Sequence, residues 1–363
     1  MEVKDFDYEL PERLIAQEPA SRRDESRLMV VNKVGGIKEH ARFFQLGDFL
    51  KSGDRLVLND SRVIPARLHG RKKSSGVEVE VLLLNELEPD RWEVLVKPGR
   101  RVKQETEIVF TSKKDGPEKK PERESRGEIT ARCLAYTDFG GRILEFNPPG
   151  RLREKLEALG EMPLPPYITE YSGDPERYQT VYASREGSAA APTAGLHFTE
   201  DLLEELKENG IDISYITLHV GLGTFRPVRT NEVEEHEMHA EYFAVSQETA
   251  REICQTRESG GRIIAVGTTV TRTLEGAARS ILEGQGRQGW TEIFIYPGYD
   301  FQVIDGLLTN FHLPKSTLLM LVSALAGREN IMQAYQEAIR REYRFYSFGD
   351  AMLIISHYKT DNP

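Results

Sequence analysis

The chain has 363 residues, of which 39% are hydrophobic and 29% are charged. This length is about twice that of a usual single domain, so two domains are expected. The net charge of −10 argues against a protein that coats nucleic acid without selectivity. The longest nearly apolar run is Leu318–Ala326. Because a membrane-spanning helix needs about 20 apolar residues, we expect no contact with a membrane.

The start of the chain and the cysteines indicate a cytoplasmic protein. Residues Met1–Asp7 are acidic and include no apolar stretch of the kind found in a secretory signal. The two cysteines, Cys133 and Cys254, lie far apart in the sequence. We therefore expect a reducing compartment and no framework of disulfides.

The first part of the chain predicts two buried strands and then an all-β segment. The buried strands are the apolar runs Leu28–Asn32 and Leu56–Asn59, and Val77–Val81 then alternates strictly. Four further strand-like pieces follow between turn residues: Trp92–Val96, Glu107–Phe110, Arg132–Ala135 and Arg142–Phe146. Such short, evenly spaced strands are typical of a small barrel or sandwich. The polar run Thr111–Gly127 predicts a mobile hairpin tip within it.

Helical periodicity begins after Gly150. Thr199–Asn209 is a clear helix with Thr199 as N-cap and Gly210 after its end. The other expected elements are helices at Leu152–Leu159, Val270–Leu282, Thr317–Ala326 and Glu329–Glu342, and strands at Ile211–Val220, Arg262–Gly267, Trp290–Tyr296 and Ala351–Ser356.

Strands that alternate with helices predict an α/β fold with a mixed sheet, and the β-rich segment interrupts it. We expect a main α/β domain of residues 1–60 and 155–363, which carries the active site, and an inserted small antiparallel β-barrel of residues 61–154. The insertion holds 20 Lys and Arg against 16 Asp and Glu, whereas the remainder has a net charge of −14. This local excess of positive charge favours binding of a polyanion, although it is also compatible with an ordinary solvated surface.

Two sequence patterns match known binding motifs but lack the context that those motifs require. Gly284–Gly289 matches GxGxxG but follows a predicted helix and precedes a strand, the reverse of a dinucleotide-binding loop. His236–His239 with Glu241 has the spacing of metal ligands, but no further His or Cys clusters with it in sequence. We expect a polar site here and no metal.

Loops rich in small residues predict a pocket for a small molecule. Gly187–Phe198 lets backbone N–H groups approach a ligand, although tight packing would also require small residues there. Two other polar, glycine-containing segments, His219–Pro227 and Gly267–Thr269, follow predicted strands. Ligands in open α/β sheets bind at the carboxyl ends of strands.

A set of motifs occurs in a characteristic order. They are Leu10–Pro19, Leu58–Arg67, Ala191–Thr199, Gly221–Pro227, His236–His239, Ala265–Thr269, Ile295–Tyr299, Thr309–Pro314 and Tyr343–Ile354. From about Phe6 to Ile354 the chain closely resembles the S-adenosylmethionine:tRNA ribosyltransferase-isomerase family of queuosine biosynthesis. The sequence departs slightly from the pattern of this family at two positions. Ser61 stands where we expect Thr, and Ala189 stands where we expect Val.

The resemblance implies an α/β fold with an inserted β-barrel and an unusual reaction. The family moves the ribosyl part of S-adenosylmethionine onto 7-aminomethyl-7-deazaguanine at the wobble position of tRNAs with GUN anticodons, those for Asp, Asn, His and Tyr. The product is epoxyqueuosine-tRNA, and adenine and methionine leave. S-adenosylmethionine is thus a consumed ribosyl donor, no true cofactor is implied, and we expect a monomer.

The reaction chemistry suggests roles for residues in the matching motifs. Protons on C5′ beside a sulfonium are acidic, so a general base is needed, and loss of adenine is helped by a proton donor. We expect His239 or His312 to act as base or acid, with Glu237 and Asp60 orienting or assisting. Candidate substrate-binding residues are Thr193, Gly195, His197, Gly223, Arg226, Thr268, Thr269, Tyr296 and Asn310, with Arg226 contacting the methionyl carboxylate.

Basic residues in the insertion are the candidates for tRNA phosphate contacts. They are Arg67, Arg71, Lys72, Lys73, Arg100, Arg101 and Lys103. Three other functions stay open at this point: an S-adenosylmethionine-dependent RNA methyltransferase, a metal-dependent hydrolase that uses His236 and His239, and a non-catalytic RNA-binding module. A methyltransferase would differ from a ribosyltransferase in its product, a metal-dependent hydrolase in its bound metal, and an RNA-binding module in its lack of turnover.

Overall fold

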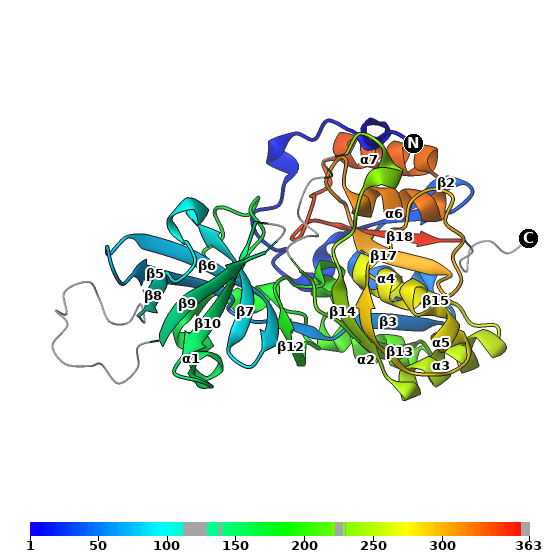
Figure 1. The fold of residues 1–363 in the computed structure, drawn as a ribbon. Coiled ribbons are helices and arrows are strands. Elements are labelled where there is room, and N and C mark those ends of the chain that lie inside the picture. Colours follow the sequence, from blue (N-terminus) through cyan, green and yellow to red (C-terminus); the bar gives the residue numbers. More distant parts are fainter. Residues whose placement is uncertain (112–128, 138–139, 222–227, 229, 357–363) are drawn as a thin grey trace, which may run out of the picture. The chain divides into compact units, whose positions relative to one another are not determined.

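The computed structural model describes residues 1–111, 129–137, 140–221, 228 and 230–356 (Figure 1). The chain forms two compact units. The first comprises Met1–Arg62, Pro165–Arg185 and Ala191–Pro363, and the second comprises Val63–Leu164 and Glu186–Ala190. The second unit extends ten residues past the expected boundary at 154. Helix α1 (Arg151–Leu159) packs on β10 (Arg142–Asn147), and β11 (Gly160–Glu161) pairs with β5 (Arg67–Lys72), so both belong to this unit.

The first unit is built on a nine-stranded mixed sheet with the order β16-β14-β13-β3-β15-β17-β18-β1-β2. Its strands are β1 (Arg27–Asn32), β2 (Gly36–Arg42), β3 (Arg55–Asn59), β13 (Asp212–Leu218), β14 (Glu241–Val245), β15 (Ile263–Val266), β16 (Arg287–Thr291), β17 (Gly306–Asn310) and β18 (Ala351–Ile355). The four central strands β13, β3, β15 and β17 are mutually parallel. Their carboxyl ends therefore meet at one edge of the sheet.

Helices cover both faces of this sheet. They are α2 (Glu200–Glu208), α3 (Gln247–Glu258), α4 (Thr268–Gly276), α5 (Ala278–Leu282), α6 (Thr317–Ala326) and α7 (Arg328–Arg340). One core cluster joins sheet residues such as Leu58 and Leu308 to α2 and to two 3-10 helices, η4 (Phe43–Phe49) and η7 (Thr193–His197). Helix α4 packs against β13, β3, β15 and β17. It begins directly after β15, at the edge where the carboxyl ends of the parallel strands meet.

The second unit is a closed six-stranded antiparallel barrel. Its strands are β5 (Arg67–Lys72), β6 (Glu78–Glu88), β7 (Arg91–Lys97), β8 (Glu107–Phe110), β9 (Ile129–Tyr136) and β10 (Arg142–Asn147). They pair in the order β5-β6-β7-β10-β9-β8, and β5 closes the barrel against β8. A side chain at Gly70 would place its Cβ 2.7 Å from Ile108 of β8, so this closure requires glycine.

Short elements complete the described residues. The strands β4 (Ser61–Val63) and β12 (Arg185–Ser188) form a two-stranded sheet. The remaining 3-10 helices are η1 (Val3–Phe6), η2 (Glu12–Leu14), η3 (Arg23–Glu25), η5 (Gly99–Arg101), η6 (Pro175–Tyr178) and η9 (Val233–Glu235). Among the described residues, no helix is both long and apolar enough to span a membrane.

The predicted fold class, a mixed-sheet α/β unit with an antiparallel β-barrel, is confirmed. One predicted strand was wrong in its position: Trp290–Tyr296 is expected as a strand, but β16 spans Arg287–Thr291. The strand pairs with β14 at the edge of the sheet and alternates little in hydrophobicity, so its sequence pattern is weak. Most of the predicted tip Thr111–Gly127 lies outside the described residues.

Candidate active site

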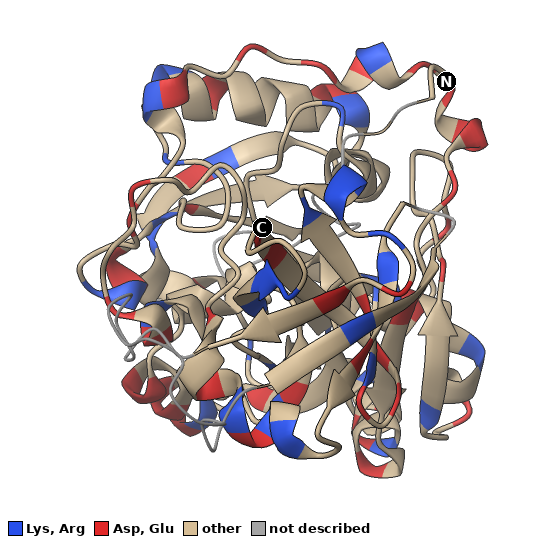
Figure 2. Ribbon diagram, turned by 60° about the vertical axis from the view of Figure 1, so that its left-hand side comes forward, with Lys and Arg blue, Asp and Glu red and all other residues tan. Residues whose placement is uncertain are grey.

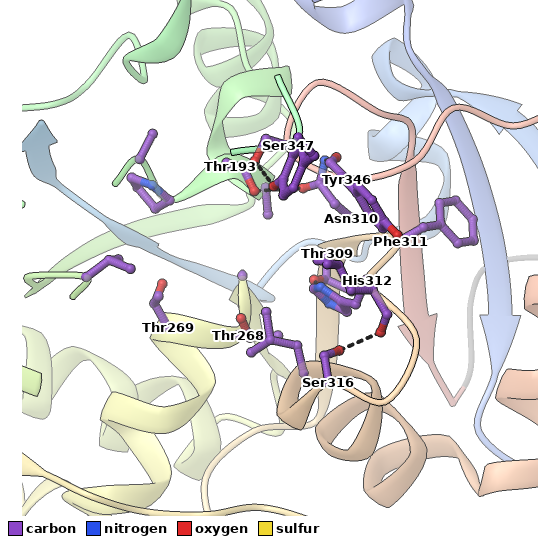
Figure 3. A pocket seen from close by; sticks show the side chains of 18 residues that line it. Thr193, Thr268, Thr269, Thr309, Asn310, Phe311, His312, Ser316, Tyr346 and Ser347 are labelled. Atoms are coloured by element: carbon purple, nitrogen blue, oxygen red, sulfur yellow. Dashed lines mark hydrogen bonds between the residues drawn. The ribbon is translucent and has the colours of Figure 1, made fainter. Parts of the chain in front are cut away.

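A pocket lies at the edge of the first unit where the parallel strands end (Figure 3). Its wall comes from segments that follow β13, β15 and β17, from η7, and from the turn before β18. The lining includes Tyr167, Thr193, Val220, Thr268, Thr269, Thr309, Asn310, Phe311, His312, Tyr346 and Ser347. The pocket thus combines hydroxyl groups, an amide, an imidazole and aromatic rings.

The start of α4 contributes backbone donors to this pocket. Gly267 precedes the helix with φ of +96°, a conformation that favours glycine, and no side chain caps the helix. The first N–H groups of a helix have no partner within the helix, and the helix dipole makes this end attractive to negative charge. Asn59 links Thr269 to β13, since its Nδ2 donates to Leu218 O at 3.0 Å and to Thr269 Oγ1 at 3.5 Å.

His197 lies behind the pocket wall and does not line it. Its Nδ1 is 2.7 Å from Ser26 Oγ, its Nε2 is 3.3 Å from Asn310 Nδ2, and its ring stacks on Phe43. Burial lowers the pKa of His197 to about 3, with smaller contributions from nearby arginines. The imidazole is therefore neutral at pH 7. His197 was predicted to bind substrate, but the structure places it against Asn310, which lines the pocket.

His312 lines the pocket and is held on both sides. Its Nε2 is 2.9 Å from Thr309 Oγ1 (Figure 3). Its backbone N–H donates to the Tyr335 hydroxyl at 2.8 Å. The Tyr8 hydroxyl donates to the His312 carbonyl oxygen. Burial lowers the pKa of His312 to about 3, so this imidazole is also neutral at pH 7.

Two tyrosines form an aromatic wall. The rings of Tyr167 and Tyr346 have centroids 4.8 Å apart, and the Tyr167 hydroxyl lies 2.7 Å from Ser347 Oγ. Tyr346 has φ of +71°, which is rare for an aromatic residue. Burial raises the pKa of Tyr346 to about 12, so its hydroxyl stays protonated at pH 7. Neither tyrosine was predicted as a site residue, although Tyr346 belongs to the motif Tyr343–Ile354.

Gly195 does not line the pocket, but it permits the course of η7. A Cβ on Gly195 would lie 2.0 Å from the Tyr182 hydroxyl and 2.8 Å from Thr180 Cγ2. Any larger residue would displace η7, on which Thr193 is carried. Gly195 was predicted to bind substrate, but the structure places it outside the pocket lining, where it permits the close approach of η7 to Tyr182.

The predicted catalytic residues are separated in the first unit. His312 lines the pocket, whereas Glu237 and His239 are exposed and do not. Asp60 follows β3 outside the pocket lining, where it accepts hydrogen bonds from Thr217 Oγ1 at 2.7 Å and from Ser184 Oγ at 3.2 Å. Tyr296 packs on Phe294 and does not line the pocket either.

His219 is a histidine that sequence reasoning left without a role. It follows β13, one residue before the pocket-lining Val220, and stacks on Tyr242. Burial lowers the pKa of His219, and the Asp60 carboxylate opposes this effect. The sequence feature that could have identified His219 as a site residue is its place after a strand, in the motif His219–Pro227.

Two predicted substrate-binding residues, Gly223 and Arg226, lie outside the described residues. The preceding residue Gly221 is held by a buried ion pair. Its N–H donates to Glu241 Oε1 at 3.1 Å, and the other carboxylate oxygen of Glu241 pairs with Arg272 of α4. The side chains of Glu241 and Arg272 are 3% and 5% exposed.

Among the residues that the structure describes, no three His, Cys, Asp or Glu side chains gather as a metal site. His236 instead packs edge-on against Phe294, and burial lowers its pKa, with the nearby His239 adding to the effect.

Comparison with known proteins assigns the chain to a family. The family model described as queuosine biosynthesis protein matches residues 3–354. Two relatives are named S-adenosylmethionine:tRNA ribosyltransferase-isomerase. The one from Staphylococcus haemolyticus is 55% identical and the one from Halothermothrix orenii is 56% identical, and each match covers 98% of this chain and all of the relative. The chain belongs to the S-adenosylmethionine:tRNA ribosyltransferase-isomerase family. It is therefore a transferase.

A solved structure agrees with this family assignment. The crystal structure of an S-adenosylmethionine tRNA ribosyltransferase from Thermotoga maritima is 42% identical in sequence, covers 97% of this chain and all of its own, and superposes with a TM-score of 0.54. The mixed sheet and the barrel described above are thus the fold of the ribosyltransferase-isomerase family.

The barrel of this family member carries all of the predicted tRNA-binding residues. A groove on it is lined by Lys72, Lys73 and Lys103, together with Glu105 and Glu107. Outside this groove, Arg71 pairs with Glu78 at 3.3 Å, Arg67 donates to Leu164 O at 3.2 Å, and Arg100 and Arg101 are exposed on η5. Figure 2 shows Lys and Arg interspersed with Asp and Glu along the chain.

Proposed function

We propose that this enzyme transfers and isomerises the ribosyl group of S-adenosylmethionine onto 7-aminomethyl-7-deazaguanine at the wobble position of tRNAs with GUN anticodons. Epoxyqueuosine-tRNA forms, and adenine and methionine are released. The observation that carries this proposal is the pocket at the strand ends, which joins aromatic rings, hydroxyl groups, a neutral histidine and a helix N-terminus in a chain of this family. The enzyme acts in the cytoplasm as a monomer and uses S-adenosylmethionine as a substrate, with no separate cofactor.

The pocket chemistry fits the parts of S-adenosylmethionine. The methionyl carboxylate suits the uncapped start of α4 at Thr268 and Thr269, because free N–H groups and the helix dipole favour an anion. His312 is a histidine of the pocket lining, and its imidazole is unprotonated at pH 7. We propose that His312 removes the proton from C5′ beside the sulfonium.

Product analysis tests this function. The purified protein is incubated with S-adenosylmethionine and a GUN-anticodon tRNA that carries 7-aminomethyl-7-deazaguanine, and free adenine is measured by chromatography. We expect adenine with this tRNA and none with the same tRNA carrying guanine at the wobble position. Formation of S-adenosylhomocysteine in place of adenine would identify a methyltransferase and contradict the proposal.

We propose that the barrel groove binds tRNA phosphates through Lys72 and Lys103. Replacing both lysines with glutamine is expected to weaken tRNA binding and to reduce the slope of log K against log salt by about one for each lost phosphate contact. The measurement is a tRNA-binding titration at several salt concentrations. Lys207→Gln, on the exposed face of α2, is the matched control. An unchanged slope in the double variant would refute the groove as a phosphate site.

A further inference from the structure

The pocket contains a hydrogen-bond acceptor whose direction is fixed. Asn310 is 2% exposed, and its Nδ2 donates to the Tyr346 carbonyl oxygen at 3.0 Å and contacts His197 Nε2 at 3.3 Å. A carbonyl oxygen can only accept, and an amide nitrogen has two hydrogens, so both donors of Asn310 are used inside the protein. Its Oδ1 is consequently the acceptor on the pocket side, where it accepts from Thr193 Oγ1 at 3.5 Å and retains a second lone pair.

The Tyr346 carbonyl oxygen determines this orientation, and His197 supports it from behind. Because the imidazole is neutral, one ring nitrogen donates and the other accepts. With Nε2 facing the Asn310 amide nitrogen, Nε2 accepts, and Nδ1 carries the hydrogen and donates to Ser26 Oγ at 2.7 Å. If Asn310 turned over, its oxygen would face the Tyr346 carbonyl oxygen, which is repulsive. His197 would also have to move its hydrogen from Nδ1 to Nε2.

The same hydrogen bonds hold an aromatic ring in a strained position. Tyr346 has φ of +71°, a conformation that is unfavourable for a non-glycine residue and persists only where the surrounding structure fixes it. Its N–H donates to Phe311 O at 3.1 Å, and its carbonyl oxygen accepts from Asn310 and also from Gly349 N at 2.9 Å. The acceptor Asn310 Oδ1 and the Tyr346 ring are thus parts of one hydrogen-bonded unit that lines the pocket (Figure 3).

We propose that Asn310 Oδ1 and the Tyr346 ring together form the binding site for an amino-substituted purine, with His197 as a positioning residue that acts through Asn310. The acceptor takes a hydrogen from the exocyclic amine, and the ring stacks on the face of the base. This inference rests on the proposed function, in which the pocket holds S-adenosylmethionine, and it assigns the adenine moiety to this site. The modified base of the tRNA also carries an amino group, so the test separates these two sources.

The first test concerns the aromatic ring. The Kd of S-adenosylmethionine is measured by calorimetry without tRNA. Tyr346→Leu is expected to weaken binding at least ~5-fold, because stacking of a base on an aromatic ring contributes about 1–3 kcal/mol, whereas Tyr346→Phe keeps the ring and stays within ~3-fold of the wild type. Tyr343→Leu, the same change in a buried tyrosine outside the pocket lining, is the control and leaves Kd unchanged. Equal Kd values for the wild type and Tyr346→Leu would overturn the ring assignment.

The second test concerns the acceptor and His197. The wild type is expected to bind S-adenosylmethionine about tenfold more tightly than its 6-oxo analogue, in which an acceptor replaces the amine. His197→Phe removes the acceptor that faces Asn310 Nδ2, so the ratio of the two Kd values is expected to fall toward one. His197→Gln retains an acceptor in its amide oxygen and is expected to keep the ratio of the wild type. A purely structural role of His197 would weaken both ligands alike and preserve their ratio in His197→Phe. An unchanged ratio in His197→Phe would therefore overturn the positioning role, and thermal unfolding confirms that each variant is folded.

The outcomes separate this inference from the proposed function. A wild-type protein that releases no adenine from S-adenosylmethionine in the presence of the modified tRNA contradicts the proposed function itself. A wild-type protein that binds S-adenosylmethionine, with Kd and ratio unaffected by the variants, contradicts only the adenine site. If Tyr346→Leu leaves the Kd of S-adenosylmethionine unchanged but raises KM for the modified tRNA, the bound purine is the tRNA base and the adenine assignment is wrong.

Discussion

Replacing His312 with glutamine is expected to lower the rate of adenine release at least ~100-fold, because a positioned general acid or base contributes about 10²–10⁴-fold. His312 is the candidate catalytic residue that lines the pocket, and Thr309 and Tyr335 fix its position. The measurement is adenine release at saturating S-adenosylmethionine and modified tRNA, with binding of S-adenosylmethionine measured in parallel to show that the pocket persists.

The pH dependence of the wild-type enzyme checks the same assignment. Burial lowers the pKa of His312 to about 3, so the imidazole becomes protonated only as the pH falls toward that value. The rate is therefore expected to show no transition from this residue between pH 5 and 8. A transition near pH 6.5 that disappears in His312→Gln would show that the imidazole titrates normally and would contradict its buried, neutral state.

Two histidine variants complete this experiment. His40→Gln changes a partly buried histidine of β2 that contacts Tyr343, outside the pocket lining, and is the matched control. His239→Gln changes the exposed alternative candidate. If His239→Gln abolishes adenine release while His312→Gln retains full activity, the acid–base role belongs to His239.

Replacing Glu241 with glutamine is expected to lower the free energy of unfolding by about 3–5 kcal/mol, because removal of one partner leaves a buried charge unpaired. Arg272 would keep its charge at a site where its side chain is 5% exposed. The same change weakens the anchor of Gly221. Urea unfolding, followed by circular dichroism, measures the effect.

Exposed and compensated variants define the control for this prediction. Glu283→Gln removes an exposed partner of Arg279 on α5 and is expected to cost less than about 1 kcal/mol. The double variant Glu241→Gln, Arg272→Met removes both charges and is expected to recover most of the lost stability. A loss in Glu241→Gln no larger than that in Glu283→Gln would mean that the buried pair contributes little.

Local signals made much of the fold predictable. Thr199 caps α2 as its sequence indicates, and its hydroxyl accepts from Leu202 N. The strict alternation at Val77–Val81 lies in β6 of the barrel. By contrast, β17 is buried along its whole length, and its sequence Gly306–Asn310 gives no alternation by which a strand is recognised.

The site was predictable only in part, because tertiary contacts decide which polar residues face the pocket. Asn310 and His312 follow a strand, and their motif marked them as candidates. Nothing local in the sequence distinguishes Tyr346, whose backbone conformation depends on Phe311 and Asn310. The spacing of His236 and His239 resembled a ligand pair, yet His236 packs on Phe294 and His239 is exposed.

The place of β18 in the sheet has a consequence for synthesis of the chain. It lies between β17 and β1, and Leu28 of β1 is paired in register with Ala351. On the ribosome, β1 and β2 therefore emerge long before the strand that joins them to the rest of the sheet. Tyr346, on the turn before β18, is made equally late. The nascent protein must keep the apolar β1 from aggregating until nearly the whole chain has been translated, and the pocket is completed among the last events of folding.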